Sequence, residues 1–271
     1  MSDLASKAAQ NLLAIRRAKP LIHNITNFVV MNPTANALLA CGASPVMAHA
    51  ENEVEEMVVF AGALVLNIGT LTDAWVASML KAGKKATQLG KPIVLDPVGS
   101  GATKLRTDTA KAILGQTNVS VVRGNASEIL SLSGRDAAIK GVDSCNSVED
   151  AARVAGELSL ELGTTLAITG PTDLVTDGRR AVFIEGGHAL MPFVTGTGCT
   201  ASALVGAFLA VDPDPVSAAA TALAFLGLAG ERAGARAEGP GSFQVHLLDA
   251  LHAISPEELA AGCRIREERH G

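Results

Sequence analysis

Short apolar runs recur along this chain, separated by stretches with helical spacing, and this alternation limits the fold more than any other feature. The stretches that predict helices are 3–18, 71–89, 107–115 and 148–162. The runs that predict strands are Pro20–Ile22, Ser44–Met47, Ala63–Leu66, Pro92–Leu95, Val119–Val122 and Thr165–Ile168. Strands and helices in alternation predict an α/β fold with a largely parallel central sheet and helices on both faces.

The last third of the chain departs from this alternation. Two shorter β-type runs, Leu174–Thr176 and Ala181–Ile184, predict an antiparallel edge, and from Thr197 onward the chain reads as helix nearly to its end. Capping boxes are predicted at Ser147–Asp150 and Ser255–Glu258. No repeat, low-complexity tract or linker divides the sequence, so we expect residues 1–271 to form one domain.

Composition narrows the class of protein. Apolar residues make up 48% of the chain and aromatic residues 3%, so small aliphatic side chains must build the core. A net charge of -5 argues against a nucleic-acid surface, which needs an excess of Lys and Arg. No membrane span or signal peptide is evident, and the cysteines lack paired spacing, so we expect a cytoplasmic protein. The four cysteines are Cys41, Cys145, Cys199 and Cys263.

Small and polar residues follow most of the predicted strands. In open α/β sheets ligands bind at the carboxyl ends of the strands. Gly, Asn and Pro also serve simply to turn a chain, so a single loop of this kind carries little weight. Because the pattern repeats, and Asp96 and Arg123 each follow a buried run, we expect one shared site. The segments concerned are His23-Asn24, Asn67–Thr70, Asp96–Gly101, Arg123–Asn125 and Thr169–Pro171.

A glycine-containing segment, Gly196–Cys199, precedes a helix of small residues. Glycines at a helix start let backbone N–H groups approach an anion, and the helix dipole favours negative charge there, so this loop predicts a phosphate site. A helix N-terminus also lowers the pKa of a thiol, which would activate Cys199. The alternative, a small packing residue, stays open at this point.

The same loop satisfies the loose dinucleotide pattern G-x-G-x-x-A, which is typical of nicotinamide-dependent oxidoreductases. That pattern requires a preceding strand in an early βαβ unit, whereas here the loop follows Met191–Phe193 late in the chain. An oxidoreductase is therefore the alternative from a different class. No G-x-x-x-x-G-K-[ST] motif occurs, and the six histidines are scattered, so we expect neither a P-loop nor a histidine metal site.

Together these segments resemble the hydroxyethylthiazole kinase family, which has the ribokinase-like fold. The likeness rests on Gly196–Cys199, Asp96–Gly99 and Arg123–Glu128, with Ile22–Asn27, Gly42–Ala48 and Leu66–Thr70, and it covers about residues 15 to 230. It implies ATP-dependent phosphorylation of 4-methyl-5-(2-hydroxyethyl)thiazole, a salvage step in thiamine synthesis. It also implies a homotrimer with sites between neighbouring subunits. The runner-up is a related kinase acting on hydroxymethylpyrimidine or a sugar, but those usually carry Asp where Cys199 stands.

The resemblance further implies a role for each matching residue. Cys199 would be catalytic, Asp96 and Glu128 would organise Mg²⁺, and the remaining residues would bind substrate (Met47, Gly196 and Asn24) or ATP (Arg123, Thr169 and Gly198). Simpler interpretations stay open for four of them. Asp96 could cap a turn, Arg123 could pair with a surface carboxylate, Met47 could belong to the core, and Glu128 could cap a helix with Asn125.

Overall fold

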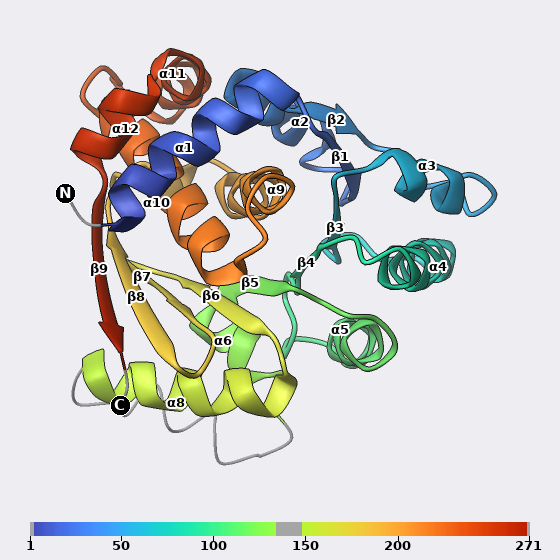
Figure 1. Ribbon diagram of the computed structural model, residues 1–271. Helices are drawn as coiled ribbons and strands as arrows, with labels where there is room; N and C mark the ends of the chain where they lie inside the picture. The colour runs from blue at the N-terminus through green and yellow to red at the C-terminus, as the bar shows by residue number, and fades with distance from the viewer. Residues whose placement is uncertain (1–2, 134–147, 270–271) are drawn as a thin grey trace.

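The computed structural model describes residues 3–133 and 148–269, which form a nine-stranded sheet in the order β2-β1-β3-β4-β5-β6-β7-β8-β9 (Figure 1). The neighbours from β2 to β6 are parallel, and those from β6 to β9 are antiparallel. The strands are β1 (Leu21–Ile25), β2 (Ser44–Val46), β3 (Ala63–Asn67), β4 (Ile93–Asp96), β5 (Val121–Asn125), β6 (Thr165–Thr169), β7 (Thr172–Thr176), β8 (Arg180–Glu185) and β9 (Arg264–Arg269).

Helices cover both faces of the sheet, as the alternating pattern predicts. On one face a core forms with α1 (Asp3–Ala18), α2 (Met31–Cys41), α9 (Thr197–Leu209), α10 (Pro215–Gly234), α11 (Pro240–Ala253) and α12 (Pro256–Gly262). The opposite face carries α3 (Val54–Phe60), α4 (Asp73–Gln88), α5 (Lys104–Gln116), α6 (Ala126–Leu130) and α8 (Val148–Leu162). Figure 1 shows α9 and α10 on one side of the sheet and α8 on the other.

The small residues of the sequence are concentrated in α9 and α10. Every residue of α9 from Thr200 to Leu209 is buried, because this helix has the sheet on one side and α2 and α10 on others. A helix that is apolar around its whole circumference is expected in such an inner position. Alanine-rich surfaces allow these close contacts, which explains why so few aromatic residues are needed.

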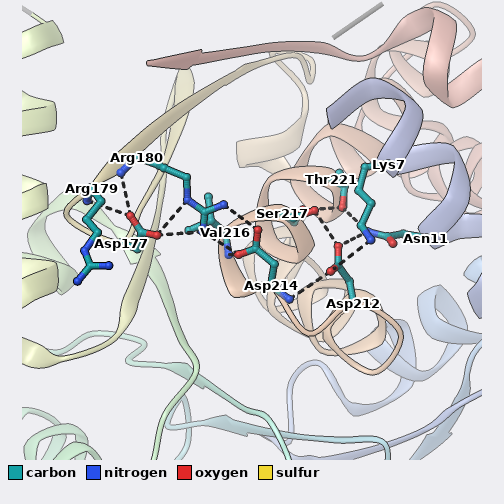
Figure 2. Close-up of polar contacts among 10 residues, drawn as sticks. All are labelled: Lys7, Asn11, Asp177, Arg179, Arg180, Asp212, Asp214, Val216, Ser217 and Thr221. Atoms are coloured by element: carbon teal, nitrogen blue, oxygen red, sulfur yellow. Dashed lines mark hydrogen bonds and ion pairs between the residues drawn. The ribbon is translucent and has the colours of Figure 1, made fainter. Parts of the chain in front are cut away.

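A buried polar network fastens α10 at the amino-terminal edge of the sheet (Figure 2). Asp212 is 2% exposed and accepts hydrogen bonds from Asn11 Nδ2 (2.9 Å) and Ser217 Oγ (2.7 Å). Beside it, Asp214 caps α10 and receives both terminal nitrogens of Arg180 at 2.7 and 2.8 Å. The network therefore ties α1 and the β7–β8 hairpin to the start of α10.

The predicted elements match the structure with a few exceptions. The antiparallel edge and the Ser255–Glu258 capping box are confirmed. The expectation of helix nearly to the chain end is wrong at Arg264–Arg269, which pairs with β8 as an edge strand. Charged residues suit such an edge, and Ile265 lies opposite Ile184 while Arg266 covers the ring of Phe183. The predicted Ser147–Asp150 capping box begins outside the described residues.

Candidate active site

Four polar side chains stand where neighbouring parallel strands end. Asn67 of β3 and Asp96 of β4 are register partners, and alternation along β5 and β6 places Arg123 and Thr169 on the same face. That face is the one packed by α9. Parallel strands present their carboxyl ends at one edge, so residues far apart in sequence meet there.

Asp96 and Arg123 form a buried ion pair at the centre of this edge. Asp96 Oδ2 accepts hydrogen bonds from Arg123 Nη2 (2.6 Å), Asn67 Nδ2 (2.7 Å) and Ser202 Oγ (2.8 Å). Arg123 Nε donates to Ser202 Oγ at 2.7 Å, and Nη1 lies 3.4 Å from Thr169 Oγ1. The surface pairing considered for Arg123 is therefore wrong, because its partner is a fully buried carboxylate.

The glycine turn lies directly above this ion pair. Gly196 is the N-cap of α9 with φ +87°, a left-handed conformation, and a Cβ there would lie 2.8 Å from Val30. A Cβ on Gly198 would lie 3.0 Å from Arg123 Nη1, so the first turn of α9 rests against the guanidinium. Since Gly196 offers no capping side chain, the first N–H groups of α9 are free to bind an anion beside Arg123.

Cys199 follows the turn, and two asparagines hold its sulfur. Asn67 Nδ2 lies 3.1 Å and Asn27 Nδ2 3.6 Å from Sγ. Burial, and secondarily the charge of Asp96, raises the pKa of the thiol to about 11, although Arg123 and the two amides act in the opposite direction. The expected lowering of the thiol pKa is therefore wrong, since burial outweighs the groups that lower it.

Glu128 supports the loop after Asp96. Its Oε2 accepts the N–H of Asn125, completing a capping box at the start of α6, and its Oε1 accepts the N–H of Gly99 at 2.9 Å. The predicted helix-capping role of Glu128 is thus confirmed. It does not exclude further contacts, because each carboxylate oxygen can accept more than one hydrogen bond.

These carboxylates fit a hard cation that keeps most of its own water. Among the described residues, no three His, Cys, Asp or Glu side chains are grouped to enclose a metal ion. Mg²⁺ is usually bound by one or two carboxylates together with substrate phosphates, so a closed protein cage is not required. Asp96 Oδ1 is buried without a hydrogen-bond partner in the described chain, which leaves one acceptor at this edge unused.

A cavity of about 640 Å³ opens beside the turn. Its lining includes Thr169 and Gly198, two of the three residues predicted to bind ATP, but not the third, Arg123. It extends over the β6–β7 turn, the end of β8 and α10. Most of the lining is Gly, Ala, Pro, Leu and Met, which suits the apolar faces of a purine base. A helix N-terminus at one side and apolar walls beyond it are surfaces that can accommodate the phosphates and the base of a nucleotide.

The residues predicted to bind substrate are more dispersed. Gly196 lies in the turn, while Met47 lies in the β2–α3 connection, half-buried, where its carbonyl oxygen is 3.0 Å from His49 Nδ1. Asn24 is fully buried in β1, and its Nδ2 donates to the carbonyl of Ile22. No hydrogen bond or ion pair joins Met47 or Asn24 to the Asp96–Arg123 pair among the described residues, and their substrate roles stay predictions.

The sequence interpretation assigned no role to Asn27, Asn67 or Ser202. Asn27 and Asn67 lie in the segments that carry the family likeness, and Asn67 opens the segment Asn67–Thr70 that follows a predicted strand, so the strand-end pattern contained it without giving it a role. Ser202, one turn into α9, gave no comparable signal. The dinucleotide interpretation also fails structurally, because a 3₁₀ turn, η1 (Met191–Phe193), precedes the glycine loop instead of a strand.

Comparison with solved structures identifies the class first. A pyridoxal kinase from Staphylococcus aureus in complex with pyridoxal superposes with a TM-score of 0.63 over 93% of this chain and 99% of its own, at 17% identity. At that identity the likeness shows the fold alone. The shared fold, a largely parallel sheet with helices on both faces, is the ribokinase-like fold.

Closer relatives identify the family. The model of the hydroxyethylthiazole kinase family matches residues 12–257. A hydroxyethylthiazole kinase of Desulfotalea psychrophila is 66% identical over 267 residues, 98% of each chain. The structure of a hydroxyethylthiazole kinase from Pyrococcus horikoshii has a TM-score of 0.89 at 48% identity, covering 97% of this chain and 99% of its own. This chain belongs to the hydroxyethylthiazole kinase family.

Proposed function

We propose that this chain transfers the γ-phosphoryl group of ATP to the hydroxyl of 4-methyl-5-(2-hydroxyethyl)thiazole, as a single kinase domain. The observation that carries the proposal is the contact of the glycine turn with the buried Asp96–Arg123 pair beside the 640 Å³ cavity. Phosphoryl transfer depends mainly on positioning and on neutralising charge. A guanidinium, free helix N–H groups and nearby carboxylates supply both.

We assign a role to each of these residues in line with the family likeness. Arg123 and Thr169 bind the phosphates together with the N–H of Gly198. Nη1 of Arg123 and Oγ1 of Thr169 lie 3.4 Å apart, so both can reach one phosphate group. Asp96 and Glu128 would hold Mg²⁺, which would neutralise phosphate charge when bound. Gly196, Met47 and Asn24 form the side of the site that binds the thiazole alcohol.

In the reaction the hydroxyl oxygen forms a bond to the γ-phosphorus while the bond to the bridging oxygen breaks, and ADP leaves. A thiol with a pKa of about 11 is protonated at neutral pH, so Cys199 is not a ready base. We assign it the positioning of the hydroxyl, which suits a loose transition state that requires little base catalysis. The hydroxyl proton passes to solvent water after the new bond has largely formed.

Exposed apolar side chains near the turn support the homotrimer. Phe28 and Val29 follow β1 and are 60% and 59% exposed, and Phe193, just before the turn, is 72% exposed. Val30 touches the position of Gly196, so this apolar surface adjoins the proposed substrate side. A neighbouring subunit would cover it and complete the site. Light scattering after size exclusion tests the trimer, and a monomeric mass would refute it.

ADP release is the decisive assay. ATP and Mg²⁺ are offered with the thiazole alcohol, hydroxymethylpyrimidine, ribose or pyridoxal in separate reactions, and we expect turnover with the thiazole alcohol. Asp96→Asn serves as the inactive control. Turnover with another alcohol alone would refute the assigned substrate.

None of the helices described is long and apolar enough to span a membrane. We place the reaction in the cytoplasm.

A further inference from the structure

The cavity beside the glycine turn is lined by one carboxylate, that of Asp173, and His188 is the other titratable side chain in the lining. A carboxylate among mainly apolar walls is unfavourable unless a donor satisfies it. Burial raises the pKa of Asp173 to about 6, although the N–H of Gly170 and the charge of Arg123 lower it. A ligand in this cavity therefore meets a single, poorly solvated carboxylate.

The β6–β7 hairpin determines where this carboxylate lies. Ile168 pairs with Leu174, so Thr169 and Asp173 stand opposite each other on either side of the tight turn and share one face. Oγ1 of Thr169 lies 3.4 Å from Nη1 of Arg123. Asp173 consequently lies next to the part of the cavity that binds phosphates.

One oxygen of Asp173 is already used. Oδ1 accepts the N–H of Gly170 at 2.9 Å, whereas Oδ2 has no hydrogen-bond partner in the described part of the chain. An ionised carboxylate only accepts, so the ligand must donate to Oδ2. Phosphate oxygens do not donate when ionised. The ribose hydroxyls do, and they lie between the phosphates and the base, whereas the adenine amino group lies beyond.

We propose that Asp173 binds the ribose of the nucleotide by accepting a hydrogen bond from its 2′- or 3′-hydroxyl through Oδ2. This assignment rests on the proposed function, because it takes the cavity as the ATP site. It makes Asp173 a residue that determines nucleotide specificity, selecting against nucleotides that lack the ribose hydroxyl it contacts. The bond to Gly170 holds the carboxylate in place for this contact.

Calorimetric titration with ATP, 2′-deoxy-ATP and 3′-deoxy-ATP, without the alcohol, tests the proposal on the unmodified protein. A hydrogen bond to a charged group corresponds to about a 10- to 100-fold change in Kd, so at least one analogue should bind more weakly by that factor. In Asp173→Ala the Kd for ATP should rise by a similar factor, and the difference among the three nucleotides should disappear.

Two controls separate this role from a structural one. Asp173→Asn keeps an acceptor for the N–H of Gly170, so its thermal unfolding midpoint should equal that of the parent while its preference for ATP shrinks. Glu257→Gln, an exposed carboxylate on α12, should change neither quantity. Equal Kd values of the parent for all three nucleotides, or an unchanged preference in Asp173→Ala, would overturn the assignment and leave the kinase proposal standing. If the parent bound no ATP, both proposals would be overturned.

Discussion

Removing the positive partner of the buried pair is the sharpest test of how this site is built. In Arg123→Met the carboxylate of Asp96, which is 0% exposed, would lose the donor at 2.6 Å. Breaking a buried ion pair in this way typically costs about 3–5 kcal/mol, because a charge is left without its partner. Asp96 would keep its hydrogen bonds from Asn67 and Ser202, so we expect the lower end of that range, about 3 kcal/mol.

Urea unfolding, followed by the fluorescence of the single tryptophan, Trp75, measures this loss. All variants should be compared at one protein concentration, since an oligomer makes stability depend on concentration. The double variant Asp96→Asn/Arg123→Met removes both charges and should be more stable than Arg123→Met by about 1–3 kcal/mol.

The control is an exposed pair of the same kind. Arg153 and Glu157 lie 2.7 Å apart on α8 with side chains 64% and 61% exposed, and Arg153→Met should change stability by less than about 0.5 kcal/mol. The stabilising role of the buried pair would be refuted if Arg123→Met lowered the free energy of unfolding by no more than Arg153→Met does. It would also be refuted if the two single substitutions at the buried pair were simply additive.

Three further predictions concern the thiol, the polar network and pH. Cys199→Ser should keep ATP binding but lower turnover, and Cys199→Asp should stay active; turnover of the serine variant at the parent rate would show that the thiol has no catalytic role. Because the pKa of this thiol is about 11, alkylation of Cys199 by iodoacetamide should be slow at pH 7.5 and accelerate up to pH 10, and a rate independent of pH would contradict this. Asp212→Ala leaves the hydroxyl of Ser217 and one N–H of Asn11 without their acceptor, while Asn11 keeps its bond to Thr221, so the free energy of unfolding should fall by about 2–3 kcal/mol, and an unchanged urea midpoint would contradict this. As the pH falls from 7 to 5, protonation of Asp173 should raise the Kd for ATP. The fold should not be destabilised, because the raised pKa of Asp173 means that the native state favours the protonated form. In Asp173→Asn this contribution to the pH dependence of the Kd should be absent.

Much of the fold followed from local pattern alone. Apolar runs of strand length alternating with helical spacing determined a parallel sheet with helices on both faces, and every parallel strand was placed to within a few residues. The polar residues after those strands predicted a shared edge, since parallel strands in one sheet must end on the same side. The local pattern did not predict the edge strand Arg264–Arg269. This strand forms by pairing with β8, and the spacing of its own apolar residues does not indicate a strand.

The chemistry of the site depended on contacts that no local pattern contains. Asn67 and Asn27 reach Cys199 across 132 and 172 residues of sequence, and Ser202 reaches Asp96 across 106. Which side chains lie at the carboxyl edge of the sheet could be inferred from the sequence, because periodicity and chain direction determine where each strand ends. Only the tertiary structure decided that Arg123 pairs with Asp96 and that the pKa of Cys199 rises, because burial and the distances between charges control both.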